Sequence, residues 1–132
     1  MSKKYLTIST PTESVRFAPD KIVYILAGGN YSEFYQVDKN MNLLMLQLGK
    51  VEEEIDNQLG NDANTFIRIG KSYIINRNYI YHIKVQKKEL VLSDMATFSY
   101  TLSPSKEALR SLKEHIDKTA KEENLWRINI MT

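Results

Sequence analysis

The chain has 132 residues, a length typical of one domain with a single hydrophobic core. Its formal net charge of +2 is too small to indicate a nucleic-acid partner, so only the distribution of charge is informative. Cysteine is absent, which excludes disulfides, thiolate zinc sites and a cysteine nucleophile.

The sequence shows no sign of export or membrane insertion. The N-terminal segment MSKKYLTIST lacks the apolar core of a signal peptide, and no apolar run approaches the roughly 20 residues that cross a bilayer. We therefore expect a soluble cytoplasmic protein.

Short strands are predicted in the first half of the chain. Residues 21–27 (KIVYILA) form a nearly continuous apolar run, typical of a central strand, whereas the other segments mostly alternate apolar with polar side chains. Gly28, Gly29 and Asn30 predict a tight turn, because glycine readily adopts positive φ angles. The predicted strands cover residues 4–8, 14–18, 21–27, 31–37 and 41–48.

A helix is predicted over residues 50–59, where apolar side chains recur at helical spacing. Glutamates occupy the remaining faces, and Gly60 and Asn61 are expected to end the helix. The apolar positions are Leu48, Val51, Ile55 and Leu59.

Residues 66–88, FIRIGKSYIINRNYIYHIKVQKK, contain lysine and arginine but no acidic residue, whereas the charged residues between Val51 and Asn64 are all acidic. Apolar and β-branched residues alternate with the basic ones, which predicts strands with basic side chains on one surface or in loops. A nearly neutral chain polarised in this way is typical of a protein that presents one basic face to a polyanion.

The next segment predicts a hairpin over residues 89–92 and 97–102, followed by a helix. Ser103 as the N-cap and Pro104 at the first helical position predict the start of that helix, which is expected to fade after Ala120. Its apolar stripe consists of Leu109, Leu112 and Ile116.

Residues 124–132 (NLWRINIMT) are predicted to form a last strand, with Trp126, Ile128 and Ile130 on one side. This side is expected to complete the core, and a dimer contact is the alternative. Many short strands with two helices indicate a β-rich α+β domain.

Few groups are available for catalysis or metal binding. His82 and His115 are the only histidines, and neither occurs in a metal-binding helical spacing, so both are expected to be structural or exposed. No set of nucleophile, base and oxyanion donors is recognisable. We predict a protein that is not an enzyme and holds no cofactor or metal, unless a cleft at His82 contains a metal ion.

Polar residues near the predicted loops are better suited to binding. Lysine and arginine can read guanine edges, asparagine can read adenine, and serine can contact phosphates or bases. A solvated strand surface is the alternative explanation for the charges, and half-buried core positions are the alternative for the tyrosines. The candidate nucleic-acid-binding residues are Asn30, Tyr31, Ser32, Lys71, Ser72, Arg77, Ser105 and Lys106.

The run FIRIGKSYIINRNYI at residues 66–80 resembles the hallmark of the LytTR-type DNA-binding domain, which reads Phe-x-Arg-x-x-[basic or polar]-Ser-[aromatic]-[aliphatic]-[aliphatic]-Asn and ends in an aliphatic residue. The segments DKIVYILAGGNYSEFY, LGKVEEEIDNQL and TLSPSKEAL are similar to other parts of this family, so the resemblance covers about residues 5–110. The hallmark positions are occupied by Phe66, Arg68, Ser72, Tyr73, Ile74, Ile75, Asn76 and Ile80.

The resemblance implies a bacterial transcription regulator that binds double-stranded DNA. It also implies an elongated stack of short, mainly antiparallel β-sheets with one flanking helix and a C-terminal helix. Family members insert loops into successive major grooves and often bind in tandem to paired direct repeats. We expect a DNA-binding domain over residues 1–110, with a C-terminal helix and tail over residues 111–132 packed on it.

The resemblance further implies three reading loops, with Lys71 as the main base reader. Arg68 and Asn76 also lie on the motif, but we expect Arg68 to pair with acids of the predicted helix and Asn76 to hold the turn before Ile80. The reading loops are residues 29–32, residues 70–72, and Ser103 with Ser105 and Lys106.

The sequence departs from the family in two respects. Many members carry arginine at the Pro104 position, and because proline supplies no donor, Lys106 would have to substitute. Most members are fused to a receiver domain, whereas we expect this chain to be a stand-alone domain without a receiver, which would take its signal from a separate partner. Alternative functions are homodimerisation or partner binding through the C-terminal tail or a sheet edge, and single-stranded RNA binding through Tyr31, Tyr73 and Tyr81.

Overall fold

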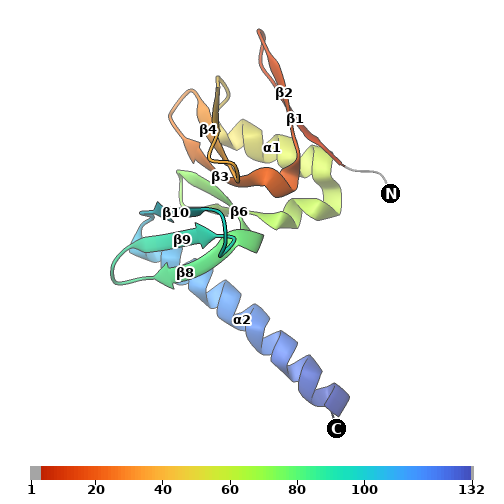
Figure 1. Cartoon of the computed structure of the whole chain (residues 1–132), viewed down its shortest axis with the longest axis vertical. Coiled ribbons are helices and arrows are strands. Elements are labelled where there is room, and N and C mark those ends of the chain that lie inside the picture. Colours follow the sequence, from red (N-terminus) through yellow and green to blue (C-terminus); the bar gives the residue numbers. More distant parts are fainter. Residues whose placement is uncertain (1–3, 132) are drawn as a thin grey trace.

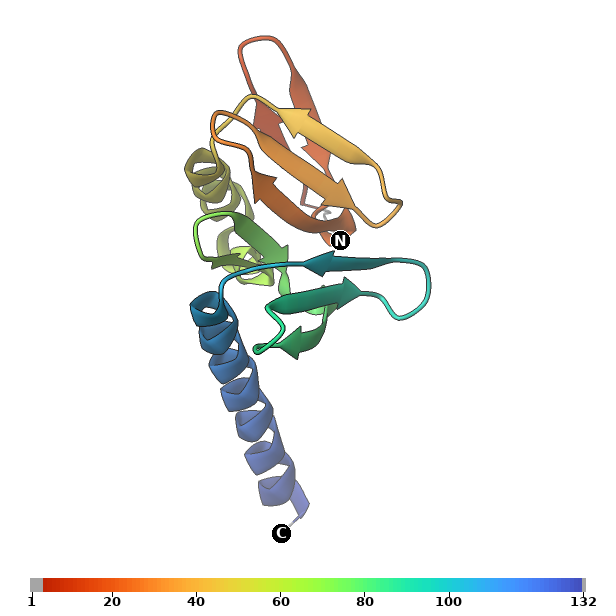
Figure 2. The same ribbon diagram turned by 90° about the vertical axis from the view of Figure 1, so that its left-hand side faces the viewer.

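The computed structural model describes the backbone of residues 4–131 and the side chains of residues 4–123. Within these residues, ten β-strands form three antiparallel sheets, accompanied by two α-helices. Figures 1 and 2 show the sheets stacked along the long axis, with helix α2 extending from one end. The predicted β-rich α+β fold with an elongated stack of short sheets is confirmed.

Strands β1 (Leu6–Ser9) and β2 (Ser14–Phe17) form an N-terminal hairpin. Their alternating pattern places Leu6, Ile8 and Phe17 on the buried face of the hairpin. This face belongs to the first hydrophobic core, and β1 packs against α1. Both strands overlap the segments predicted from the sequence.

A five-stranded sheet in the order β5-β4-β3-β7-β6 forms the centre of the stack. Its middle strand β3 contributes side chains to both hydrophobic cores, which explains the nearly continuous apolar run. The strand predicted over residues 41–48 is too long, because the chain leaves the sheet after Leu44 and α1 begins at Leu48. The strand bounds are Ile22–Ala27 (β3), Ser32–Gln36 (β4), Met41–Leu44 (β5), Phe66–Ile69 (β6) and Tyr73–Asn76 (β7).

Helix α1 (Leu48–Leu59) covers one face of the central sheet, in agreement with the predicted apolar spacing. Val51, Ile55 and Leu59 are buried in the first core. Gly60 adopts φ +57°, a conformation that favours glycine, and the helix ends there.

A three-stranded sheet and helix α2 cover the opposite face of the central sheet and enclose a second core. Its strands are β8 (Ile80–Lys84), β9 (Glu89–Ser93) and β10 (Ser99–Leu102), in the order β10-β9-β8. The predicted hairpin is confirmed, since Leu90 on β9 pairs with Leu102 on β10.

Tyrosines form the contact between the two larger sheets. Tyr24 and Tyr35 stack with their ring centroids 4.5 Å apart, and Tyr100 meets Tyr24 edge-on at 5.3 Å. Burial raises the pKa of Tyr24, and burial together with a hydrogen bond to Glu33 raises the pKa of Tyr35 to about 12. Phenols are neutral near pH 7 even at the ordinary pKa of tyrosine, and both rings act here as packing groups.

The start of helix α2 (Lys106–Met131) differs from the prediction. The N-cap is Ser105 instead of Ser103, because the Ser105 Oγ accepts a hydrogen bond from Ala108 N at 3.2 Å. Pro104 is buried in the loop before the helix and does not occupy its first helical position.

The end of α2 corrects a second prediction, the strand over residues 124–132. Residues 124–131 continue the helix, and no glycine or proline follows Pro104 to interrupt it. The side chains of Trp126, Ile128 and Ile130 lie outside the described residues, so their contacts stay a prediction. Neither helix in the described part of the chain is long and apolar enough to cross a membrane.

Candidate nucleic-acid interface

Three loops lie together on one side of the molecule, the left-hand side in Figure 2. They are residues 28–31 between β3 and β4, residues 70–72 between β6 and β7, and residues 103–105 between β10 and α2. Ala27 N donates a hydrogen bond to Ser72 O at 2.8 Å and thereby joins the first two loops. The second and third loops line a shared pocket of about 470 Å³. We call these three loops the loop edge.

The first loop depends on two adjacent glycines. Gly29 adopts φ +82°, and Gly28 donates its backbone N–H to Tyr31 O at 2.8 Å. A Cβ atom on Gly28 would lie 2.2 Å from the Tyr31 ring, so the ring can lie here only because residue 28 is glycine. Asn30 is exposed and Tyr31 is half-buried, which makes Asn30 the more accessible candidate in this loop.

Ser32 is a predicted site residue that the structure places in the interior. It is the first residue of β4, and its exposed fraction is 0%. Its Oγ donates a hydrogen bond to Leu46 O at 2.7 Å, which ties β4 to the segment between β5 and α1. Because the hydroxyl is buried and already has a partner, the assignment of Ser32 to a DNA contact is contradicted.

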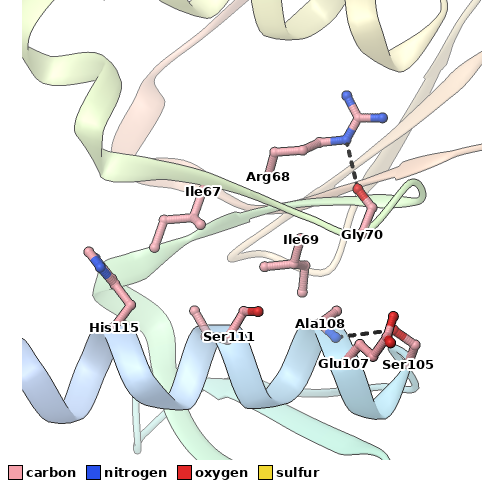
Figure 3. Close-up of a pocket in the computed structure, with 10 residues that line it drawn as sticks. Ile67, Arg68, Ile69, Gly70, Ser105, Glu107, Ala108, Ser111 and His115 are labelled. Atoms are coloured by element: carbon pink, nitrogen blue, oxygen red, sulfur yellow. Dashed lines mark hydrogen bonds between the residues drawn. The ribbon is translucent and has the colours of Figure 1, made fainter.

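The second loop exposes the side chains of Lys71 and Ser72, following Gly70 at φ +58°. Arg68 on β6 holds the backbone of this loop, because its Nε donates to Gly70 O at 3.3 Å and its NH2 donates to Lys71 O at 3.0 Å. Its NH1 pairs with Glu52 of α1 at 3.0 Å, which confirms the expected pairing with a helix acid. Figure 3 shows the Arg68 side chain pointing away from α2.

The third loop leads to a second group of basic residues. Ser105 is exposed but its hydroxyl caps α2, while the Lys106 Nζ donates to Gln86 Oε1 at 3.4 Å. This contact links the start of α2 to the β8–β9 turn, where Lys87 and Lys88 are exposed. Both lysines belong to the basic stretch 66–88 recognised in the sequence, but they were not among the candidate contact residues; the fold brings their turn next to the third loop.

Arg77 lies away from the loop edge. It begins the 3₁₀ helix η3 (Arg77–Tyr79) after β7, at the opposite end of that strand from Ser72. Its guanidinium donates to the Nε2 of His115, an exposed residue on α2. The fold therefore does not bring Arg77 together with the other predicted site residues.

Asn76 has the structural role that the sequence predicted. Its side chain is fully buried, and its Nδ2 donates to Ile22 O at 2.9 Å. Its Oδ1 accepts from Asn78 N at 3.0 Å, which fixes the turn between β7 and β8.

The tyrosines considered for RNA stacking occupy different environments. The Tyr31 ring lies against Gly28, and the Tyr73 ring lies 6.3 Å from that of Tyr24. Tyr81 is 58% exposed on β8, next to the exposed His82. Among the described residues, no group of three or more His, Asp or Glu side chains could hold a metal ion.

Comparisons with known proteins agree with this architecture. A model of the LytTr DNA-binding domain family matches residues 12–117. A solved LytTr DNA-binding domain, from a protein of Bacillus cereus described as a methyl-accepting/DNA response regulator, shares the fold with a TM-score of 0.55 and 19% identity. The match covers 86% of this chain and 96% of that one. No curated protein matches the sequence. Because the family model spans most of its length, this chain belongs to the LytTr DNA-binding domain family.

Proposed function

We propose that this DNA-binding domain recognises a specific duplex sequence by inserting the loop edge into the major groove, and that it regulates transcription in this way. The position of the three loops on one side of the molecule is the observation that supports this proposal. Their chemistry is suitable, because exposed lysine, asparagine and serine side chains can donate to base edges and to phosphates.

The residues of the loop edge differ in their suitability for base reading. Lys71 and Asn30 are exposed near the tips of their loops, and they suit guanine and adenine edges respectively. Lys106, Lys87 and Lys88 lie beside the third loop and suit phosphate contacts, which position a protein without specifying sequence. Lys106, two residues after Pro104 in the chain, thus offers a donor that the proline lacks.

We further propose that two copies bind in tandem to paired direct repeats. Three short loops can contact only a few base pairs, so a second copy would lengthen the recognised sequence and raise its specificity. This arrangement also fits the elongated stack of sheets, which presents the loop edge along one side.

Selection of bound sites from a random duplex library tests both parts of this function. Enrichment of one motif supports sequence-specific reading, and a second motif in the same orientation at a fixed spacing supports tandem binding. A parallel selection with the Lys71→Ala variant should give a motif in which the base preference at one position is weaker. A library without any enriched motif would contradict the proposal.

We propose oligomerisation through α2 as a second function. Residues 117–123 are exposed, and Figure 1 shows this part of α2 extending away from the sheets. A truncation after Ala120 tests the idea by light scattering and DNA titration. Loss of an oligomer with retained DNA binding supports an oligomerisation role, whereas unfolding would assign the removed segment to the core.

A further inference from the structure

The guanidinium group of Arg68 on β6 connects the second loop to helix α1. Two of its nitrogens donate to the carbonyls of Gly70 and Lys71, and the third pairs with Glu52 on α1. The planar fork of arginine suits this task, because its donors point in fixed and different directions. A lysine has a single ammonium group and could not reproduce the same three contacts.

These contacts hold the second loop by its backbone and leave its side chains available. The carbonyls of Gly70 and Lys71 accept from Arg68, and the carbonyl of Ser72 accepts from Ala27 N at 2.8 Å. The side chains of Lys71 and Ser72 are exposed. Hydrogen bonds therefore fix the backbone from which the two exposed side chains project.

Glu52 in turn determines where the guanidinium lies. The Arg68 side chain is 29% exposed and that of Glu52 is 44% exposed, so the pair is partly shielded from water. Glu52 lies on α1, whose apolar face is buried in the first core, and α1 thus provides a rigid support for Arg68.

We propose that Glu52 and Arg68 are positioning residues that set the geometry of Lys71 and Ser72 for duplex recognition. This inference rests on the proposed function of the loop edge. By its charge alone, Glu52 would repel DNA and weaken binding. The inference predicts the opposite, namely that Glu52 strengthens binding to the recognised duplex.

The opposite signs allow a direct test with two neighbouring glutamates. Glu52→Ala removes the support of Arg68. Glu53→Ala removes the same charge from the same helix, where Glu53 pairs with the exposed Lys50 at 3.4 Å and, among the described residues, has no ion pair with Arg68. We expect Glu53→Ala to bind every duplex as well as or slightly better than the natural sequence. Glu52→Ala should bind the library-selected duplex about five- to tenfold more weakly, with little loss on a scrambled duplex.

Arg68→Lys separates positioning from a direct phosphate contact. This variant keeps the charge, so the positioning role predicts a lower ratio of selected to scrambled affinity and an unchanged salt dependence. A second variant, Arg68→Met, removes the charge. If Arg68 contacts a phosphate, Arg68→Met should weaken binding to both duplexes alike and reduce the salt slope by about one.

That result for Arg68→Met would overturn the inference. Equal affinities of Glu52→Ala and Glu53→Ala for the selected duplex would overturn it as well.

A measurement without DNA distinguishes failure of this inference from failure of the proposed function. The carbonyl-carbon NMR resonances of Gly70 and Lys71 should shift in Glu52→Ala and stay unchanged in Glu53→Ala. If they shift while the natural protein discriminates no duplex, loop reading is wrong but the support of the loop by Glu52 and Arg68 stands. If they do not shift, the positioning role is wrong whatever the DNA titrations give.

Discussion

Lys71 has an exposed side chain on a loop whose backbone is fixed from the protein side. If its ammonium meets a guanine edge, Lys71→Ala should lose about 1–3 kcal/mol of binding free energy on the selected duplex and much less on a scrambled one. Fluorescence anisotropy titrations measure both affinities. Lys21→Ala is the matched control. Lys21 is exposed just before β3, and the first loop of the loop edge follows the opposite end of this strand. Equal losses on both duplexes would make Lys71 a phosphate contact, and no loss would remove it from the interface.

Gly28 controls the shape of the first loop through steric exclusion. In Gly28→Ala the new Cβ would clash with the Tyr31 ring, so we expect a displaced ring and a loss of about 1–3 kcal/mol in the free energy of unfolding. Gly49→Ala on α1 is the control, because a Cβ there meets open space and the helix should gain up to about 1 kcal/mol. Urea denaturation measures both changes, and a Gly28→Ala variant as stable as the natural protein would contradict the steric argument.

Single residues also show where prediction from sequence succeeds and fails. The roles of Arg68 and Asn76 were predictable, because a guanidinium near helix acids and an asparagine in a turn have few other partners. Ser32 was assigned incorrectly because its hydroxyl partner, Leu46 O, comes from a segment whose position depends on the tertiary fold. Arg77 was close to Lys71 in sequence, yet β7 separates the two residues in space.

We predict that the stability of the β9–β10 turn depends on pH through Asp94. The Asp94 carboxylate accepts hydrogen bonds from the Thr97 hydroxyl and from the backbone N–H groups of residues 96–98. These hydrogen bonds hold the pKa of Asp94 well below its usual range, and the bond from the Thr97 hydroxyl contributes most. Since the pKa is lower in the folded state, this contribution to stability is complete above about pH 4 and is lost as the pH falls further.

Replacement of the Asp94 carboxylate tests this dependence. Asp94→Asn should lower the melting temperature at pH 7. Below about pH 4, the melting temperature of the variant should fall less steeply with pH than that of the natural protein. Thermal melts between pH 7 and pH 2 provide the measurement, with Asp117→Asn on the exposed part of α2 as the control. A decline of the same steepness in Asp94→Asn and the natural protein would show that Asp94 does not cause it.

At the level of elements, most strands and α1 follow from hydrophobic periodicity, because one face packs on a core. Strands β3 and β7 differ, since each contributes side chains to both cores. The errors occur where periodicity is ambiguous. The apolar run after Asn40 fits both a strand and the start of a helix, and residues 124–131 alternate like a strand although they continue α2. Ser103 and Ser105 are both plausible caps, and the burial of Pro104 decides between them.

At the scale of the whole molecule, the central sheet separates the two hydrophobic cores, and the first two loops of the loop edge connect its strands. The acidic residues of α1 and the basic residues of the loops were recognisable as separate groups in the sequence. The pairing of Arg68 with an acid of α1 was expected, but that its partner is Glu52 follows only from how α1 packs in the fold. The charge pattern therefore identified the region, and the fold defined the candidate site.

The central claim is that the loop edge recognises a specific DNA duplex. The most direct test is the affinity of the protein for the selected and the scrambled duplex over a range of salt concentrations. Neutralisation of four to six phosphates predicts a slope of about −4 to −5 in log affinity against log salt. We also predict a preference of about a thousandfold or more for the selected duplex. Equal affinity for the two duplexes at every salt concentration would contradict the account.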